Sequence, residues 1–209
     1  DGVSLWRPWN IDPSWKTQSG QAWFHIDQHP ISKPGKQCIQ GLINLLPTSK
    51  EIGGNVVIPK SHNFFKDIPE EYKERVERLP LDIDHFRFPH DDPKLSSEPA
   101  VMAHMEPGDM LLWDSRTIHC SSSGSSLPEG TNDLIRAASL ICMMPKELSS
   151  KEILEKRIHA AENLVSTTNW TNDFRNADEF PIILEAENRD QYKWPKKPNL
   201  SDYQKKLIA

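Results

Sequence analysis

Short apolar runs separated by turn residues occupy the first two thirds of the chain. In several of these runs apolar and polar residues alternate, which is typical of half-buried β-strands, and segments rich in Gly, Pro or Ser follow them. We expect strands at residues 22–28, 37–46, 55–59, 100–105, 110–113, 117–120 and 134–143. The pattern therefore predicts a mainly β core.

Three other segments lack this alternation. Residues 69–79 are charged and predict a surface helix, and Ser149 and Ser150 precede apolar positions at helical spacing, which predicts a capped amphipathic helix. We expect residues 192–197 and 201–209 to form a basic, aromatic C-terminal strap. The hypothesis is one enzyme-sized domain, 1–209, with the β core at about 20–146, a helical and irregular segment at about 147–209, and a missing N-terminal part because the chain does not begin with Met.

Composition narrows the possible partners. A net charge of −5 disfavours binding to nucleic acid, and no apolar run is long enough to cross a membrane. The three cysteines are far apart and form no C-x-x-C pair, which favours a reducing, intracellular and cytoplasmic location. We therefore expect a small-molecule substrate, and the composition leaves the oligomeric state open.

The segment WFHIDQHP places His25, Asp27 and His29 at two-residue steps. In a strand these side chains would share one face, with neighbours about 7 Å apart. A later apolar strand, after the turn Pro107-Gly108-Asp109, delivers His119. Two histidines and one carboxylate form the 2-His-1-carboxylate set that leaves three positions open on octahedral Fe(II), which indicates a catalytic rather than a structural metal site.

Arg136 lies inside the apolar run LIRAASLICMMP. A guanidinium buried in such a strand needs an anion as its partner, and the carboxylate of a ligand would serve. An H-x-D pair alone occurs often by chance. The ordered series of H-x-D, a turn and strand that deliver a histidine, and then an arginine within a strand is a much more specific pattern.

Three segments in this order resemble the phytanoyl-CoA dioxygenase family of Fe(II)/2-oxoglutarate-dependent oxygenases. HIDQH resembles the family's H-x-D-x-H, GGNVVIPKSHNFF its G-x-L-x-V-x-P-G-S-H, and PGDMLLWDSRTIHCSSSG its G-D-strand-H-G-S segment. The resemblance covers residues 23–145. Lys60 and Cys120 stand where the family has glycines, and Ala138 offers no hydroxyl two residues after Arg136.

The resemblance implies a double-stranded β-helix, the jelly-roll or cupin-like fold, with flanking helices. It implies that the iron ligands are His25, Asp27 and His119 and that Arg136 binds the distal carboxylate of 2-oxoglutarate, with Gln40 a weaker candidate for the same pocket. His29 matches a family position and is a candidate for substrate contact. Trp23 belongs to a tryptophan cluster before the metal strand and is a candidate for an aromatic wall of the substrate pocket.

The reaction implied by the resemblance uses Fe(II), 2-oxoglutarate and O2 to hydroxylate a small-molecule or acyl substrate, with release of succinate and CO2. Halogenating relatives lack the carboxylate ligand, so Asp27 favours hydroxylation. Two alternatives stay open: a cupin-like metalloenzyme of another reaction type and an inactive binding module on the same fold. The former has no need of Arg136, and the latter is expected to lose a ligand.

Overall fold

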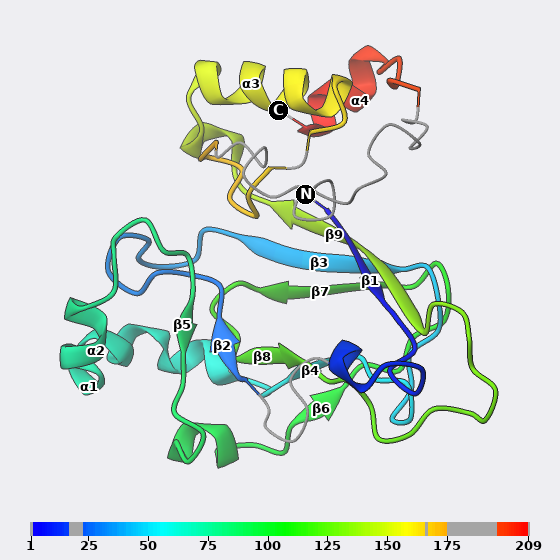
Figure 1. The fold of residues 1–209 in the computed structure, drawn as a ribbon. Coiled ribbons are helices and arrows are strands. Elements are labelled where there is room, and N and C mark those ends of the chain that lie inside the picture. Colours follow the sequence, from blue (N-terminus) through cyan, green and yellow to red (C-terminus); the bar gives the residue numbers. More distant parts are fainter. Residues whose placement is uncertain (1, 17–22, 166, 175–195, 209) are drawn as a thin grey trace. The chain divides into compact units, whose positions relative to one another are not determined.

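The computed structural model describes residues 2–16, 23–165, 167–174 and 196–208 (Figure 1). The chain divides into two compact units, Val3–Leu140 and a second formed by Ile141–Ala209 with Asp1–Gly2. Within the described residues, none of the helices combines the length and the apolar character needed to cross a membrane.

Two antiparallel sheets build the larger unit. One sheet has the order β1 (Val3–Trp6), β9 (Arg136–Met143), β3 (Ile39–Asn44), β7 (Met110–Asp114). The other has the order β5 (Phe86–Arg87), β2 (His25–Ile26), β8 (His119–Ser121), β4 (Asn55–Val57), β6 (Val101–Met102).

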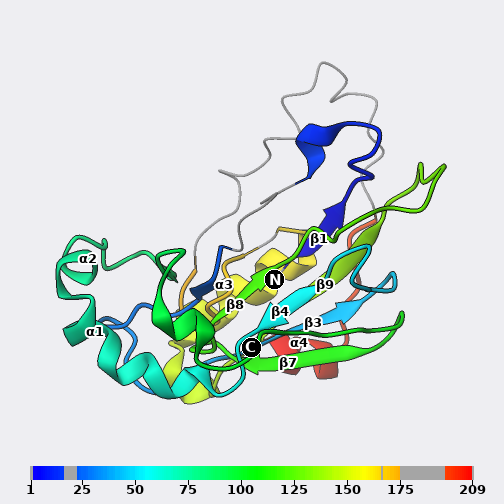
Figure 2. The ribbon, with the colours of Figure 1, turned by 90° about the horizontal axis from the view of Figure 1, so that it is seen from below.

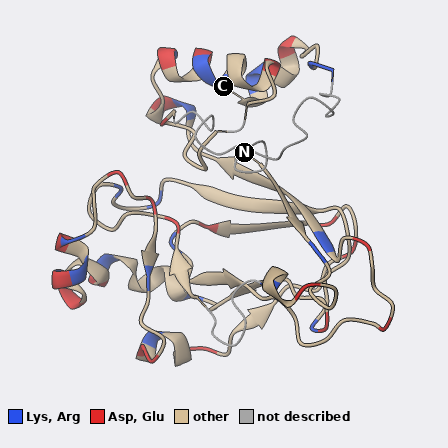
Figure 3. Ribbon diagram, viewed as in Figure 1, with Lys and Arg blue, Asp and Glu red and all other residues tan. Residues whose placement is uncertain are grey.

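The path of the chain defines the fold (Figures 1 and 2). From β1 to β4, and again from β6 to β9, consecutive strands alternate between the two sheets. This alternation is the double-stranded β-helix, so the predicted mainly β, cupin-like class is confirmed. Charged residues lie mainly on the helices and loops, whereas the strands of both sheets carry few (Figure 3).

Alternation along two short strands orients the site. Ile26 and Ile118 are buried in one apolar cluster with Ile58, while the residues next to them in sequence, His25 and His119, face the opposite side. We call the cluster that contains Ile26, Ile58 and Ile118 the outer cluster. It anchors the two strands whose opposite faces carry the histidines. A second, smaller cluster contains Leu42, Met105 and Ala138.

The helical elements of this unit are short. They are η1 (Pro13–Trp15), η2 (Ser61–Asp67), α1 (Ile68–Glu71), α2 (Lys73–Glu77) and η3 (Pro93–Ser96). The single helix predicted for 69–79 is wrong, because Tyr72 takes φ −118° and ψ 32° and separates α1 from α2. Ile68 and Val76 are buried in the outer cluster, so this segment covers the sheet instead of lying wholly in solvent.

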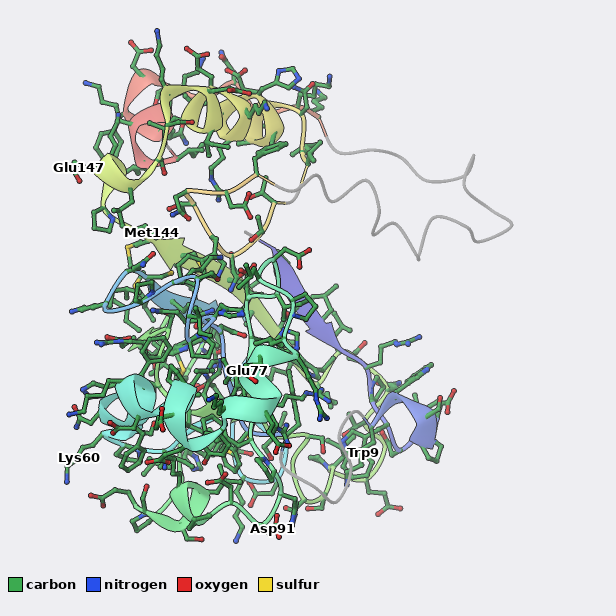
Figure 4. The ribbon with its side chains drawn as sticks, turned by 90° about the vertical axis from the view of Figure 1, so that its left-hand side faces the viewer. Trp9, Lys60, Glu77, Asp91, Met144 and Glu147 are labelled. Carbon is green, nitrogen blue, oxygen red and sulfur yellow. The ribbon has the colours of Figure 1, made fainter. Side chains whose placement is uncertain are left out.

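Two loops that flank the β4–β8 pair approach each other closely and require glycine at two positions. Gly53 and Gly124 have positive φ, and a Cβ on either would lie 2.2 Å from a backbone oxygen of the other loop. The turn before β4 and the Ser-rich loop after β8 therefore pack backbone to backbone. Lys60, which replaces a family glycine, adopts the left-handed conformation with φ 63° and points outward (Figure 4).

Several strand predictions need correction. β1 and β5 were not predicted, and the strand expected at 22–28 extends only over His25–Ile26; Ala22 lies outside the described residues. The strand ends early because Gln28 turns into the protein, where its amide donates to the carbonyls of Lys33 and Gly35 and accepts from Ser115 Oγ.

The smaller unit contains η4 (Lys146–Leu148), α3 (Lys151–Glu162) and α4 (Asp202–Ile208). The predicted cap of α3 is confirmed, since Ser150 Oγ accepts a hydrogen bond from Ile153 N at 3.2 Å. Residues 202–208 form helix α4 within the segment predicted to be helical and irregular. Residues 192–195 of the predicted strap lie outside the described part, and the strap stays a prediction.

Candidate metal centre

His25, Asp27 and His119 converge in the larger unit. His25 and His119 are direct register partners between β2 and β8, so their side chains leave the sheet next to each other. Asp27 follows the end of β2, and its carboxylate oxygens lie 3.3 Å from His25 Nε2 and 3.3 Å from His119 Nε2. One ligand atom from each residue falls within 4.8 Å of the others, so the three could hold one metal ion.

Backbone carbonyls set the orientation of both imidazoles. His25 Nδ1 lies 3.0 Å from the carbonyl of Trp23, and His119 Nδ1 lies 2.8 Å from the carbonyl of Thr117. A carbonyl only accepts, so each Nδ1 carries the hydrogen and each Nε2 faces Asp27. A lone pair on Nε2 against a carboxylate oxygen requires a cation between them, either a proton or a metal ion.

The charge state of Asp27 suits a metal ligand. Burial acts to raise the pKa of this carboxyl, but when both nitrogens of His119 and His25 carry a hydrogen, their hydrogen bonds and their charge outweigh burial and hold the pKa well below its usual range. Asp27 is therefore ionised at neutral pH.

Gln40, the weaker predicted cosubstrate residue, contacts Asp27 directly. Gln40 Nε2 donates to Asp27 Oδ2 at 2.9 Å, and Trp113 Nε1 donates to Gln40 Oε1 at 3.0 Å. Trp113 also lies against His119, with ring centroids 5.3 Å apart. The contact that the structure shows for Gln40 is thus with a candidate ligand, and its role in the cosubstrate pocket stays a prediction.

Arg136 reaches from β9 of one sheet to β8 of the other. Its side chain is buried, Nη1 donates to Ser121 Oγ at 2.7 Å, and the guanidinium lies 4.0 Å from the centroid of Trp6. Nε has no hydrogen-bond partner, and no ion pair joins Arg136 to a carboxylate among the described residues. Burial lowers the pKa of Arg136 to about 10. The larger unit thus holds a buried cation that lacks an anion in the described part of the chain.

The two predicted substrate residues have different surroundings. The ring of Trp23 stacks on His25 with centroids 4.2 Å apart, and Arg87 lies 5.1 Å from the centroid of Trp23. His29 is fully buried, and its Nδ1 accepts from the backbone N–H groups of Ile31 and Ser32. The expectation that His25, Asp27 and His29 share one strand face is wrong for His29, because the strand ends at Ile26. A role for either residue in binding substrate stays a prediction.

Comparison with known proteins adds to this geometry. The sequence model of the phytanoyl-CoA dioxygenase (PhyH) family matches residues 12–127, which is more than half of the chain. The protein belongs to the PhyH family. The match includes His25, Asp27 and His119, and the predicted family is confirmed.

Relatives of this PhyH chain are longer than the chain itself. It is 30% identical over 176 residues to Ava biosynthesis cluster protein O of Aspergillus versicolor, and the alignment covers 80% of this chain and 53% of that protein. The chain thus spans about half the length of this curated relative.

Solved structures align more weakly with the PhyH chain. AviO1 from Streptomyces viridochromogenes Tue57 aligns with a TM-score of 0.41 at 16% identity and covers 69% of this chain and 48% of AviO1. EctD from S. alaskensis, solved with 2-oxoglutarate and 5-hydroxyectoine, aligns with a TM-score of 0.37 at 13% identity and covers 68% and 44%.

A PhyH-type metal site fits the residues present. In the neutral tautomer that the backbone bonds select, both Nε2 atoms lack a hydrogen, and with the carboxylate of Asp27 between them they form the donor set that Fe(II) takes. Sequence reasoning missed Ser121 and Trp113. The position of Ser121, two residues after His119 on the same strand, could have placed it on the face of the site, whereas Trp113 had no comparable signal.

Proposed function

We propose that this PhyH-family protein is an Fe(II)- and 2-oxoglutarate-dependent dioxygenase that hydroxylates a small-molecule or acyl substrate. The observation that carries the proposal is the convergence of His25, Asp27 and His119 in the same unit as a buried Arg136 that has no carboxylate partner among the described residues. Bound iron, with 2-oxoglutarate and O2, would supply the oxidation of a substrate C–H bond and release succinate and CO2.

The protein's own residues have separable tasks in this proposal. His25, Asp27 and His119 would hold the iron, and the two carbonyl-bound Nδ1–H groups keep the rings in the orientation that presents Nε2. Arg136 and Ser121 would hold the distal carboxylate of 2-oxoglutarate, since their side chains are already joined and Ser121 is on the same strand as His119.

One indole ring lies against each of the two histidines. Trp23 stacks on His25, and Trp113 lies against His119. Indole rings at these positions restrict the access of water and limit the movement of the imidazoles. Two alternatives were left open by the sequence: another cupin-type reaction and an inactive binding module. Neither provides an anionic ligand for the buried guanidinium of Arg136. An intracellular location remains part of the proposal and rests on the cysteine pattern of the sequence.

Anaerobic titration of the Fe(II)-loaded protein with 2-oxoglutarate tests the proposal. A chelated keto acid gives a weak visible metal-to-ligand charge-transfer band, which we expect in the wild type and not in Asp27→Ala. Asp133→Ala, which changes an exposed carboxylate, is the matched control and should keep the band. If folded, iron-loaded wild type shows no band, the proposed cosubstrate is wrong.

A further inference from the structure

A hydrogen-bonded chain of three side chains runs from one sheet to the metal cluster. Gln40 on β3 and Trp113 on β7 are direct register partners, so their side chains lie on the same face of their sheet. Trp113 Nε1 donates to Gln40 Oε1, and Gln40 Nε2 donates to Asp27 Oδ2. Asp27 follows β2, which belongs to the other sheet. The amide of Gln40 therefore ties the carboxylate of one sheet to the opposite sheet.

The direction of this chain is determined by chemistry. An indole N–H is a donor only, so it selects the oxygen of the Gln40 amide and turns the NH2 group toward Asp27. If the amide were reversed, its NH2 group would face the indole N–H and its oxygen would face the carboxylate. Gln40 is only 5% exposed, which leaves little access for water to compensate such a mismatch. Trp113 thus fixes Gln40 as the donor.

We propose that Gln40 is a positioning residue for the metal ligand Asp27 and that Trp113 acts through Gln40 as its lock. The hydrogen bond that Gln40 Nε2 donates to Oδ2 restrains rotation of the carboxylate, so that Oδ1 stays opposite His25 Nε2 and Oδ2 opposite His119 Nε2. Outer partners of this kind typically change metal affinity by about 10- to 100-fold. The inference rests on the proposed metal site and adds two residues to it.

Binding of Co(II) to the full chain tests the inference without any substrate. Gln40→Leu introduces an apolar side chain of similar size and removes both hydrogen bonds, and Trp113→Phe retains an aromatic ring but removes the indole N–H. Gln37→Leu and Trp9→Phe are the matched controls. Among the described residues, the amide of Gln37 donates to the carbonyl of Pro34 and the indole N–H of Trp9 to the carbonyl of Ser123, while Lys16 Nζ lies 3.9 Å from the centroid of the Trp9 ring. Affinity is measured by calorimetry, and the ligand geometry by the visible absorption spectrum of bound Co(II).

We expect Gln40→Leu to weaken Co(II) binding by about 10- to 100-fold and to shift the Co(II) spectrum. Trp113→Phe should also weaken Co(II) binding and shift the spectrum, but by less than Gln40→Leu does. The double variant should match Gln40→Leu because Trp113 acts through Gln40. Both controls should stay within about twofold of wild type. Circular dichroism verifies that each variant is folded, and Trp113→Phe provides the test if Gln40→Leu does not fold.

Three results would overturn the inference in different ways. Wild-type protein that binds no Co(II) would remove the proposed metal site and the inference with it. If the wild type binds Co(II) and folded Gln40→Leu has the same affinity and spectrum as the wild type, the positioning role alone is wrong. If Gln40→Leu does not fold, the same result in Trp113→Phe decides this point. If the loss of Co(II) affinity in the double variant equals the product of the two single losses, the two residues act independently. Trp113 would then act through its contact with His119 and not through Gln40.

Discussion

Arg136 has a buried charge whose cost can be worked out from the structure. Burial lowers its pKa to about 10, a drop that corresponds to about 3 kcal/mol against the charged form in the folded protein. Because the folded-state pKa is the lower one, this penalty is present in full at neutral pH and fades only as the pH rises above the folded value of about 10 toward the unfolded value. Partners within the protein offset part of it.

The offsets come from Ser121 and Trp6. A hydrogen bond from a charged donor contributes about 1.5–3 kcal/mol and a cation over an indole ring about 0.5–2 kcal/mol. These gains roughly balance the burial penalty, and an apolar side chain would recover favourable burial. We therefore expect Arg136→Met without ligand to be as stable as wild type or more stable, by up to about 2 kcal/mol.

Binding of 2-oxoglutarate should make the wild type more stable than Arg136→Met. At 2-oxoglutarate concentrations of about 100 times its Kd, the wild type gains about 2.7 kcal/mol, or roughly 5–10 °C in Tm for a chain of this size. Loss of a buried charge partner costs about 2 kcal/mol or more of binding free energy, so Arg136→Met at the same concentration should gain less than about a third of that shift.

Thermal unfolding by circular dichroism, with Mn(II) as a redox-inert metal and with or without 2-oxoglutarate, provides the measurement. Arg116→Met is the matched control: Arg116 pairs with Asp114 through two nitrogens, so its loss should lower stability and leave the 2-oxoglutarate shift unchanged. A full shift in Arg136→Met, or a ligand-free variant destabilised by more than about 2 kcal/mol, would refute the reasoning.

Three further substitutions test local features. Leu164 has φ 60° just after α3, where the Val165 N–H bonds to the Ala160 carbonyl, and is 46% exposed, so Leu164→Gly should raise the free energy of unfolding by about 1 kcal/mol in urea titration; a loss would contradict the left-handed cap. Ser61→Ala should cost about 1–3 kcal/mol, because the buried Oγ accepts from Ile118 N–H; a change below about 0.5 kcal/mol would contradict this role. Ser150→Ala should lower helicity and cost about 1 kcal/mol, and Ser150→Asp, which retains a capping oxygen, should restore both.

Local sequence predicted those features that depend on neighbouring residues. Alternation of apolar and polar residues located β3, β4, β7 and β9 to within a few residues, because a strand of several residues shows its buried face as a period of two. Ser150 was predicted as a cap because capping involves only the first turn of a helix. The sequence also predicted that His25, Asp27 and His119 come together, because the types and order of residues in a motif indicate the chemistry they share.

Strand pairing decided what these patterns could not. β1 and β5 exist because β9 and β2 provide their hydrogen-bonding partners, and two to four residues are too few to show a period. Similarly, Asp27 reaches both histidines from beyond the end of its strand, and His29 turns away from them.

The contacts of Gln40 and Arg136 illustrate the same limit. The sequence by itself determined that both residues lie on strands, one with an amide and one with a cation. Only the tertiary structure decided that the amide meets Asp27 and the cation meets Ser121, because each contact joins strands of different sheets or their ends, and the register that aligns them depends on the packing of the whole unit.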